Sequence, residues 1–319
     1  MKLRWRFGII AGLFLAVFSL YPQMKMVYLR GSDWQGNYAY NDIDEVAYAA
    51  YLRALIDGRP RKNDPYTGRD DSAEHPQPES LFSIQFAGPY TIAIPARILG
   101  IGAPWAMTLA GAFAAFLTAF VIFWFIGMVT GDSWYAMAAS LVVLAGGALF
   151  AGEGAIGEIL GSGYSYPYFP GFRRYIPAMA FPAFFGLIAL VWKLLERDPN
   201  DRRRMPSGPN FLAAAAATVC FGYTAFSYFY VWTAAAAWLV CLLLSYLILR
   251  PDGFRRDLMW LVGVGAGCVV FLVPYAYLLS QRSHTMDDVQ LLILTHAPDL
   301  FRVPEVISYA VIAILMASA

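Results

Sequence analysis

The sequence predicts an all-α membrane protein whose helices cross a bilayer several times. Of its 319 residues, 59% are hydrophobic and only 14% are charged. A water-soluble domain usually carries about 25% charged residues, so this chain has too few to cover a water-facing surface of its size. The hydrophobic residues also form long runs, and roughly 20 apolar residues in a helix cross about 30 Å of hydrocarbon. The sequence therefore excludes a cytosolic globular protein.

About eight of these runs have the length expected of a membrane-spanning helix. They are residues 7–24, 104–128, 133–152, 175–194, 210–226, 229–249, 259–280 and 304–319. The first run follows Lys2, Arg4 and Arg6 as a signal peptide would, but no small-residue cleavage site follows it, so we expect an uncleaved anchor. The last run stops at Ala319 without a polar cap, so we expect the protein to continue beyond it.

We expect a multi-pass protein of the plasma (inner) membrane, and the distribution of Lys and Arg predicts that its N-terminus lies in the cytoplasm. The short inner segments of such proteins carry an excess of basic residues. This orientation places the following basic residues inside: Lys2, Arg4, Arg6, Lys193, Arg197, Arg202, Arg203, Arg204, Arg250, Arg255 and Arg256. Residues 25–103, 153–174 and 281–303 then form the outer polar segments of a single membrane domain, residues 1–319.

Residues 81–102 are apolar enough to be mistaken for another span. They contain Pro89, Pro95 and Arg97, and they continue into the next span without a polar loop. An additional crossing here would move every later loop to the other side of the membrane. We therefore expect an interfacial or re-entrant helix on the outer leaflet.

Charge balance and the absence of known motifs exclude several functions. With 23 Lys and Arg against 22 Asp and Glu, the chain has no overall field that would attract nucleic acid. Cys220, Cys241 and Cys268 lie inside apolar runs and are expected to be small hydrophobic residues buried in the membrane rather than a disulfide framework or a zinc cluster. The sequence contains no nucleotide-binding, zinc-protease or serine-hydrolase motif. The predicted spans also have no acidic residue at their middle, unlike most ion-coupled transporters.

The longest outer segment opens with a predicted amphipathic helix. Asn41 is a suitable N-cap, and Gly58, followed by Pro60, marks the end of the helix. An apolar stripe at helical spacing is expected to lie on the membrane surface. Its members are Ile43, Val46, Ala47, Ala50 and Ala54.

The polar residues of this helix have two interpretations. Asp44, Tyr48 and Tyr51 share a face beside the stripe, so Asp44 and Tyr48 are expected to face a cavity. Alternatively, Asp42, Asp44 and Glu45 only stabilise the helix macrodipole, as acids in a first turn do.

A dense set of acids and one histidine follows this helix. Its members are Asp70, Asp71, Glu74, His75 and Glu79. Such side chains are able to ligate a divalent cation. A solvated acidic loop is the alternative interpretation.

The second outer segment places two arginines among aromatic residues. Arg173 and Arg174 are flanked by Phe172 and Tyr175. Arginine binds phosphate in a bidentate geometry, so the head group of a phospholipid-like molecule is a reasonable ligand. Anchoring of the loop at the membrane surface explains the same residues equally well.

Several short motifs occur in a characteristic order. The first outer loop opens with D-E-x-x-Y at 44–48 and continues with G-x-P at 58–60 and N-D-P-Y at 63–66. A later outer loop carries F-R-R-Y-I-P at 172–177, and Y-F-Y-V-W at 228–232 opens a span. After a first span, this arrangement resembles bacterial members of the GT-C superfamily of polyprenyl-phosphate-dependent membrane glycosyltransferases.

The resemblance implies a glycosyltransferase whose donor is a sugar on a polyprenyl phosphate or diphosphate. The acceptor is a lipid, glycan or protein on the outer face of the membrane. In this family an acid of the first loop commonly acts as general base or orients the acceptor, which implies that role for Asp44, with Glu45 as its neighbour or alternate. Some relatives bind a divalent cation, so metal dependence stays open. The implied substrate-binding residues are Tyr48, Arg173, Arg174 and Tyr175, with the arginines neutralising the departing lipid phosphate.

Two functions of other classes are also compatible with the sequence. A multi-span transporter or flippase agrees with the number of spans and with the prolines at 177 and 182, which are typical of broken helices. A non-catalytic membrane scaffold subunit would use the first outer loop only to recruit partners.

Overall fold

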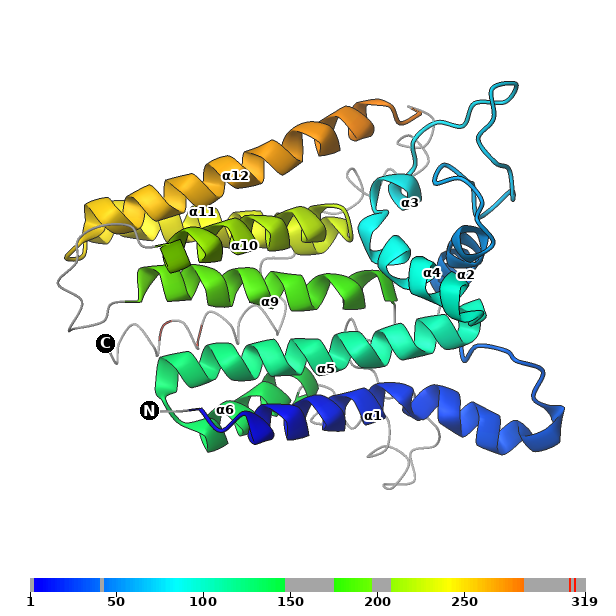
Figure 1. Cartoon of the computed structure of the whole chain (residues 1–319), viewed down its shortest axis with the longest axis horizontal. Coiled ribbons are helices and arrows are strands. Elements are labelled where there is room, and N and C mark those ends of the chain that lie inside the picture. The colour runs from blue at the N-terminus through cyan, green and yellow to red at the C-terminus, as the bar shows by residue number, and fades with distance from the viewer. Residues whose placement is uncertain are drawn as a thin grey trace. The chain divides into compact units, whose positions relative to one another are not determined.

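The computed structural model describes residues 3–40, 43–146, 175–196 and 208–283, together with positions 310 and 313. All regular structure in these residues is helical, and none of them forms a β-strand, which confirms the all-α class for this part of the chain. The chain divides into two compact units, Met1–Ser280 and Gln281–Ala319. All helices named below belong to the first unit (Figure 1).

Ten α-helices make up the described part of the first unit. They are α1 (Trp5–Arg30), α2 (Ile43–Ile56), α3 (Leu81–Ile84), α4 (Ala87–Leu99), α5 (Ala103–Thr130), α6 (Ser133–Leu141), α9 (Tyr175–Leu195), α10 (Gly208–Ala225), α11 (Phe229–Leu249) and α12 (Phe254–Ser280). A 3₁₀ turn, Gly31–Asp33, follows α1, and a π-helical segment, Val142–Gly146, follows α6.

Among the described residues, five segments are helical, long enough and apolar enough to cross a membrane. They are Trp5–Asp33, Ala103–Thr130, Pro177–Leu195, Phe229–Leu249 and Phe254–Ser280. Each coincides with a predicted span. The helix α1 is longer than the predicted 7–24 and runs through Pro22, because membrane-type helices tolerate an internal proline where neighbouring groups satisfy the freed backbone.

The other three predicted spans have different outcomes. In the range 133–152, α6 ends at Leu141 and is followed by the π-helical segment. Residues 147–152 of this range lie outside the described part of the chain. The helix α10 has 18 residues and is roughly 27 Å long, slightly short of the hydrocarbon thickness. Residues 304–319 lie almost entirely outside the described part. A total of about eight spans stays a prediction.

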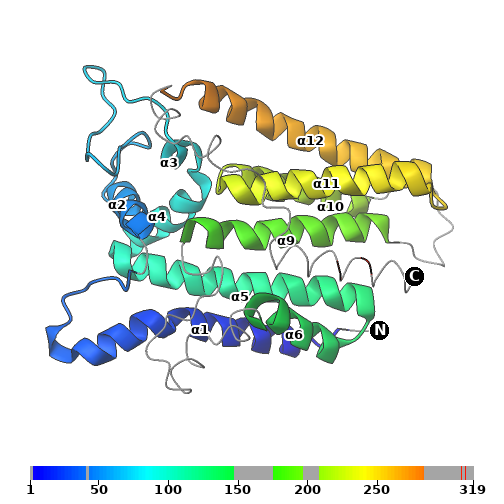
Figure 2. The same ribbon diagram turned by 180° about the vertical axis from the view of Figure 1, so that it is seen from behind.

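The long helices run side by side, and several basic residues collect at one end of them. Figures 1 and 2 show α1, α5, α9, α10, α11 and α12 with similar axes. At one end the backbone N–H of Arg4 donates to Ser133 Oγ (3.0 Å), and Arg256 reaches the carbonyl of Leu194 (3.5 Å). Phe125 and Trp192 pack between α5 and α9 near the same end. We call this the basic end; its residues are Arg4, Arg6, Lys193, Arg250, Arg255 and Arg256.

The opposite end carries α2, α3 and α4, and we call it the loop end (Figure 2). The segment that leads from α1 into α2 is fixed by one buried side chain. Gln23 Nε2 donates to the carbonyl of Asn37 (2.9 Å), and Gln23 Oε1 accepts from the N–H of Ala39 (2.9 Å). Both polar groups of the buried amide are therefore paired, and the segment before α2 is tethered to α1.

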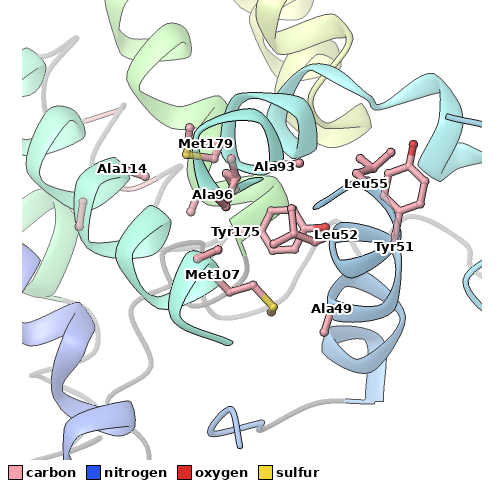
Figure 3. Close-up of a cluster of buried hydrophobic side chains, with 14 of the residues drawn as sticks. Ala49, Tyr51, Leu52, Leu55, Ala93, Ala96, Met107, Ala114, Tyr175 and Met179 are labelled. Atoms are coloured by element: carbon pink, nitrogen blue, oxygen red, sulfur yellow. The ribbon is translucent and has the colours of Figure 1, made fainter. Parts of the chain in front are cut away.

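The helix α2 buries large side chains against α4, α5 and α9 (Figure 3). Tyr51 and Leu52 are fully buried. The residues of the predicted apolar stripe have different environments, because Ala47 and Ala54 are buried in the protein whereas Val46 is 52% exposed and Ala50 is also exposed. Contact of this stripe with the membrane surface stays a prediction. Larger side chains bury more apolar area, so they decide which face of the helix turns inward.

The segment 81–102 does not form a span-length helix. It contains the single turn of α3 and then α4, whose 13 residues extend over roughly 20 Å. Gly100 ends α4 in the left-handed conformation (φ 68°), which glycine adopts without a steric penalty. The expected interfacial position of this segment at the membrane surface stays a prediction.

Candidate functional site

Two neighbouring acids of α2 lie in different environments. Asp44 is exposed, whereas Glu45 is completely buried, with 0% of its surface accessible. Successive residues of a helix point about 100° apart, so one of two adjacent acids turns inward when the other faces outward. Partial burial raises the pKa of the Tyr40 hydroxyl, and the negative charge of Glu45 raises it further. Glu45 therefore lies within electrostatic reach of the segment that precedes α2.

A hydrogen bond joins α2 to the start of α9. The hydroxyl of Tyr175 donates to the backbone carbonyl of Tyr48 at 2.8 Å. The two rings also make a T-shaped contact with centroids 6.0 Å apart. Tyr175 is 1% exposed and belongs to the cluster that surrounds Leu52 (Figure 3). Two of the predicted substrate-binding residues, Tyr48 and Tyr175, are thus in direct contact.

Phe82 of α3 connects three tyrosine rings. Its ring centroid lies 5.6 Å from that of Tyr48, 5.5 Å from that of Tyr51 and 5.9 Å from that of Tyr66. Tyr51 also donates its hydroxyl to the carbonyl of Arg61 (3.0 Å). The aromatic contacts bring three segments together: α2, the loop after it and α3.

An ion pair fixes the loop between α2 and α3. Arg61 donates from both terminal nitrogens to the two oxygens of Glu79, at 2.6 and 2.8 Å, and Ser83 Oγ donates to the same carboxylate (2.5 Å). Burial raises the pKa of Glu79, but the hydrogen bonds from Arg61 and Ser83 outweigh it, so that the pKa lies below its usual value. The bidentate geometry is the strong form of an arginine–carboxylate contact.

Two further acids of this loop form ion pairs with basic residues. Asp70 pairs with Arg59 at 2.8 Å, and Asp71 pairs with Lys62 at 3.0 Å. Hydrogen bonds from the Gln77 N–H and from Lys62 lower the pKa of Asp71. Within the part of the chain that the structure describes, no three His, Cys, Asp or Glu side chains form a group that could hold a metal ion.

The contacts of Asp70, Asp71 and Glu79 agree with a structured acidic loop rather than with a cation site. Glu74 and His75 are exposed, and the backbone N–H of His75 donates to Ser72 Oγ (3.0 Å). The predicted metal-binding interpretation of this loop therefore gains no support from the arrangement of its side chains.

Arg173 and Arg174 lie outside the described residues. The residue that follows them in the sequence, Tyr175, is the one that donates to α2. The sequence motif at 172–177 and the D-E-x-x-Y motif therefore meet at least at Tyr175 and Tyr48.

One residue of this end was not predicted to belong to the site. Tyr66 is 72% exposed, although its ring touches Phe82. Partial burial raises the pKa of the Tyr66 hydroxyl, and the negative charges of Asp44 and Asp64 raise it further, so Asp44 lies within electrostatic reach. The turn signal at 63–66 marked this position but did not indicate that the turn folds back toward α2.

The chain was compared with protein-family models, curated proteins and solved structures. No protein-family model, no curated protein and no solved structure matches this chain.

Proposed function

We propose that the chain is an integral-membrane glycosyltransferase of the GT-C type. It moves a sugar from a polyprenyl-phosphate-type lipid donor to an acceptor at the loop end of the helices. The observation that carries this proposal is the hydrogen bond from Tyr175 to the carbonyl of Tyr48. It joins the helix with the D-E-x-x-Y motif to the segment that directly follows Arg173 and Arg174 in the sequence.

In the proposed reaction, Asp44 acts as general base. Its carboxylate takes the proton of an acceptor hydroxyl, and the acceptor oxygen forms a bond to the anomeric carbon of the sugar. The bond between that carbon and the phosphate oxygen breaks, and its electron pair stays on the lipid phosphate. Arg173 and Arg174 neutralise this growing negative charge. A single displacement of this kind inverts the configuration of the anomeric carbon.

The exposure of the two acids supports Asp44 rather than Glu45 as the base. A general base has to come within hydrogen-bond distance of the proton that it removes. Asp44 is exposed at the surface of α2, whereas Glu45 is completely buried. In this assignment Glu45 has a structural role beside the catalytic acid.

The proposed orientation follows from the two ends of the helices. The short connections at the end that carries Arg4, Arg250 and Arg256 are basic, as expected of a cytoplasmic face. The basic residues of the loop end lie mostly in one long segment, which has little influence on orientation. The loop end, with α2 and its neighbours, is then the outer face of the plasma membrane. This is the face on which GT-C-type enzymes use their lipid-linked donors.

The first experiment tests Asp44→Asn in proteoliposomes. We expect transfer to fall by roughly 10²- to 10⁴-fold, the usual contribution of a general base. The assay supplies a panel of undecaprenyl-phosphate hexoses and pentoses as donors and short alkyl glycosides as acceptors. Asp57→Asn is the matched control, because Asp57 follows α2 directly, is exposed and forms a surface ion pair with Arg53.

Each outcome separates the catalytic role from a purely structural one. If Asp44 only stabilises the macrodipole of α2, its substitution will lower thermal stability slightly and leave turnover intact. Retained turnover in Asp44→Asn would therefore reject the assignment of the base. Movement of the unmodified donor across the bilayer, without transfer, would indicate a flippase instead.

A further inference from the structure

The aromatic rings near α2 differ sharply in their exposure. Tyr51 and Tyr175 are 0% and 1% exposed, and their hydroxyls donate to backbone carbonyls. Tyr66 is 72% exposed, and a T-shaped contact with Phe82 holds its ring. The folded chain therefore leaves the ring of Tyr66 in contact with its surroundings.

Local hydrogen bonds fix the position of this ring. Asp64 Oδ1 accepts from the N–H of Tyr66 (2.9 Å), and Asp64 Oδ2 accepts from Thr67 Oγ1 (2.6 Å). The carbonyl of Asp64 accepts from the N–H of Gly68 (2.8 Å), whose φ of 70° suits glycine. A ring on a turn that is already ordered loses little conformational entropy when a ligand binds.

Tyr66 is linked to the face of α2 that carries Asp44 through the ring of Phe82. Asp44 precedes Tyr48 by four residues, so the two side chains follow one another along one face of α2. Tyr48 and Tyr66 both contact the ring of Phe82. The effect of the Asp44 charge on the pKa of Tyr66, second to that of burial, agrees with this placement.

The surroundings of Tyr66 do not resemble those of a membrane-anchoring tyrosine. Its turn is flanked by the ion pairs Arg59–Asp70 and Lys62–Asp71, and its neighbour Arg69 is exposed. Aromatic residues that anchor a protein at the membrane interface have apolar surface beside them. An exposed ring among charged groups is better suited to a polar ligand with an apolar face.

We propose that Tyr66 binds the acceptor and that the acceptor is a saccharide whose ring packs on the tyrosine beside Asp44. The C–H groups on one face of a sugar ring are slightly positive and fit the negative π-face of an aromatic ring. The hydroxyls at the edge of the sugar are then available to the Asp44 carboxylate. This inference rests on the proposed glycosyltransferase function and specifies the chemical class of its acceptor.

Binding of sugars is measured separately from transfer. Saturation-transfer NMR on the full chain in detergent micelles detects binding of methyl glycosides of hexoses and pentoses. We expect Tyr66→Ala and Tyr66→Leu to reduce the saturation-transfer signal roughly three- to tenfold and Tyr66→Phe to retain it, because the aromatic face makes the contact. Tyr135→Ala is the matched control, since Tyr135 is 59% exposed and lies on α6, which starts at the basic end.

Steady-state transfer then gives the KM values for acceptor and donor. Tyr66→Ala is expected to raise the acceptor KM roughly three- to tenfold and to leave the donor KM unchanged. Equal acceptor KM values for wild type and Tyr66→Ala, with normal turnover, would overturn the role of Tyr66 and leave the glycosyltransferase proposal standing.

The opposite result is also informative. If sugars bind in a Tyr66-dependent manner but no lipid-linked donor supports transfer, the saccharide surface is supported and the proposed enzymatic function fails. If no methyl glycoside binds to the wild-type chain and the acceptor KM does not depend on Tyr66, the inference is wrong.

Discussion

Tyr175 connects two distant parts of the chain through a single hydroxyl. Its partner is the backbone carbonyl of Tyr48, 127 residues earlier, and Tyr175 itself is 1% exposed. A buried polar group left without a partner costs about 1–3 kcal/mol, so the pair is strongly favoured once the surrounding side chains have packed. The contact therefore helps to fix α2 against α9.

The residue-scale prediction compares Tyr175→Phe with Tyr48→Phe. Tyr175→Phe leaves the carbonyl of Tyr48 without its donor and is expected to lower the free energy of unfolding by about 1 kcal/mol. Tyr48→Phe retains the ring and the carbonyl, so that this hydrogen bond persists. Thermal unfolding in detergent measures both variants. A loss of stability in Tyr48→Phe as large as that in Tyr175→Phe would contradict this account.

The sequence predicted that residues near Asp44 form a helix, but not which of their side chains are buried. The apolar periodicity between positions 43 and 54 and the glycine at 58 correctly indicated a helix, because periodicity and end signals are local properties. The burial of Glu45 and the exposure of Val46 were not predictable in the same way. They depend on how α2 packs against α4, α5 and α9, which lie at least 30 residues away in the sequence.

At the scale of helices, small residues allow close approach. A Cβ built on Gly222 of α10 would lie 2.5 Å from the ring of Phe271 in α12. A Cβ built on Gly267 of α12 would lie 2.5 Å from Thr218 of α10. These reciprocal contacts resemble the small-residue interfaces through which membrane helices pack.

The corresponding prediction pairs Gly222→Ala with Gly263→Ala. The added methyl group at position 222 meets the ring of Phe271, so we expect a loss of about 1–3 kcal/mol of stability. Gly263 has no heavy atom within 4 Å of the added Cβ, and alanine there is expected to be neutral or stabilising by up to about 1 kcal/mol. Thermal unfolding in detergent provides the measurement. The packing argument fails if both alanine variants change the unfolding temperature equally.

Helix ends were less predictable than helix existence. The predicted span begins at residue 259, but the helix α12 already begins at Phe254. The first turn of the helix contains Arg255, Arg256 and Asp257, which the apolar run does not include. Charged residues end an apolar run in the sequence, but they do not end a helix in the folded chain. The same reasoning explains why α1 continues past Lys25 to Arg30.

For the whole molecule, the two ends of the long helices are chemically different. One end carries Arg4, Arg6, Arg250, Arg255 and Arg256, and the other carries α2, α3 and the ion-paired loop. Ion pairs such as Arg61–Glu79 and Arg59–Asp70 occur at the loop end, where they hold the chain between α2 and α3. This asymmetry supports the proposed orientation with the basic end in the cytoplasm.

The orientation is tested by labelling single added cysteines in right-side-out membrane vesicles. Glu74→Cys at the loop end is expected to react with a membrane-impermeant maleimide, whereas Asp252→Cys at the basic end is expected to react only after permeabilisation. Both positions are exposed. The unmodified chain is the control, since Cys220, Cys241 and Cys268 lie within apolar helices. Labelling of both positions from the same side would reject the proposed topology.

The hydrogen bond at Tyr48 uses the peptide carbonyl rather than the side chain, which leaves position 48 open to chemical replacement. A photoreactive phenylalanine analogue placed there would keep the acceptor for Tyr175 and present a crosslinking group beside Asp44. Irradiation of native membranes followed by mass spectrometry would then capture whichever lipid or glycan occupies the site. The architecture thus offers a direct route to the natural substrate.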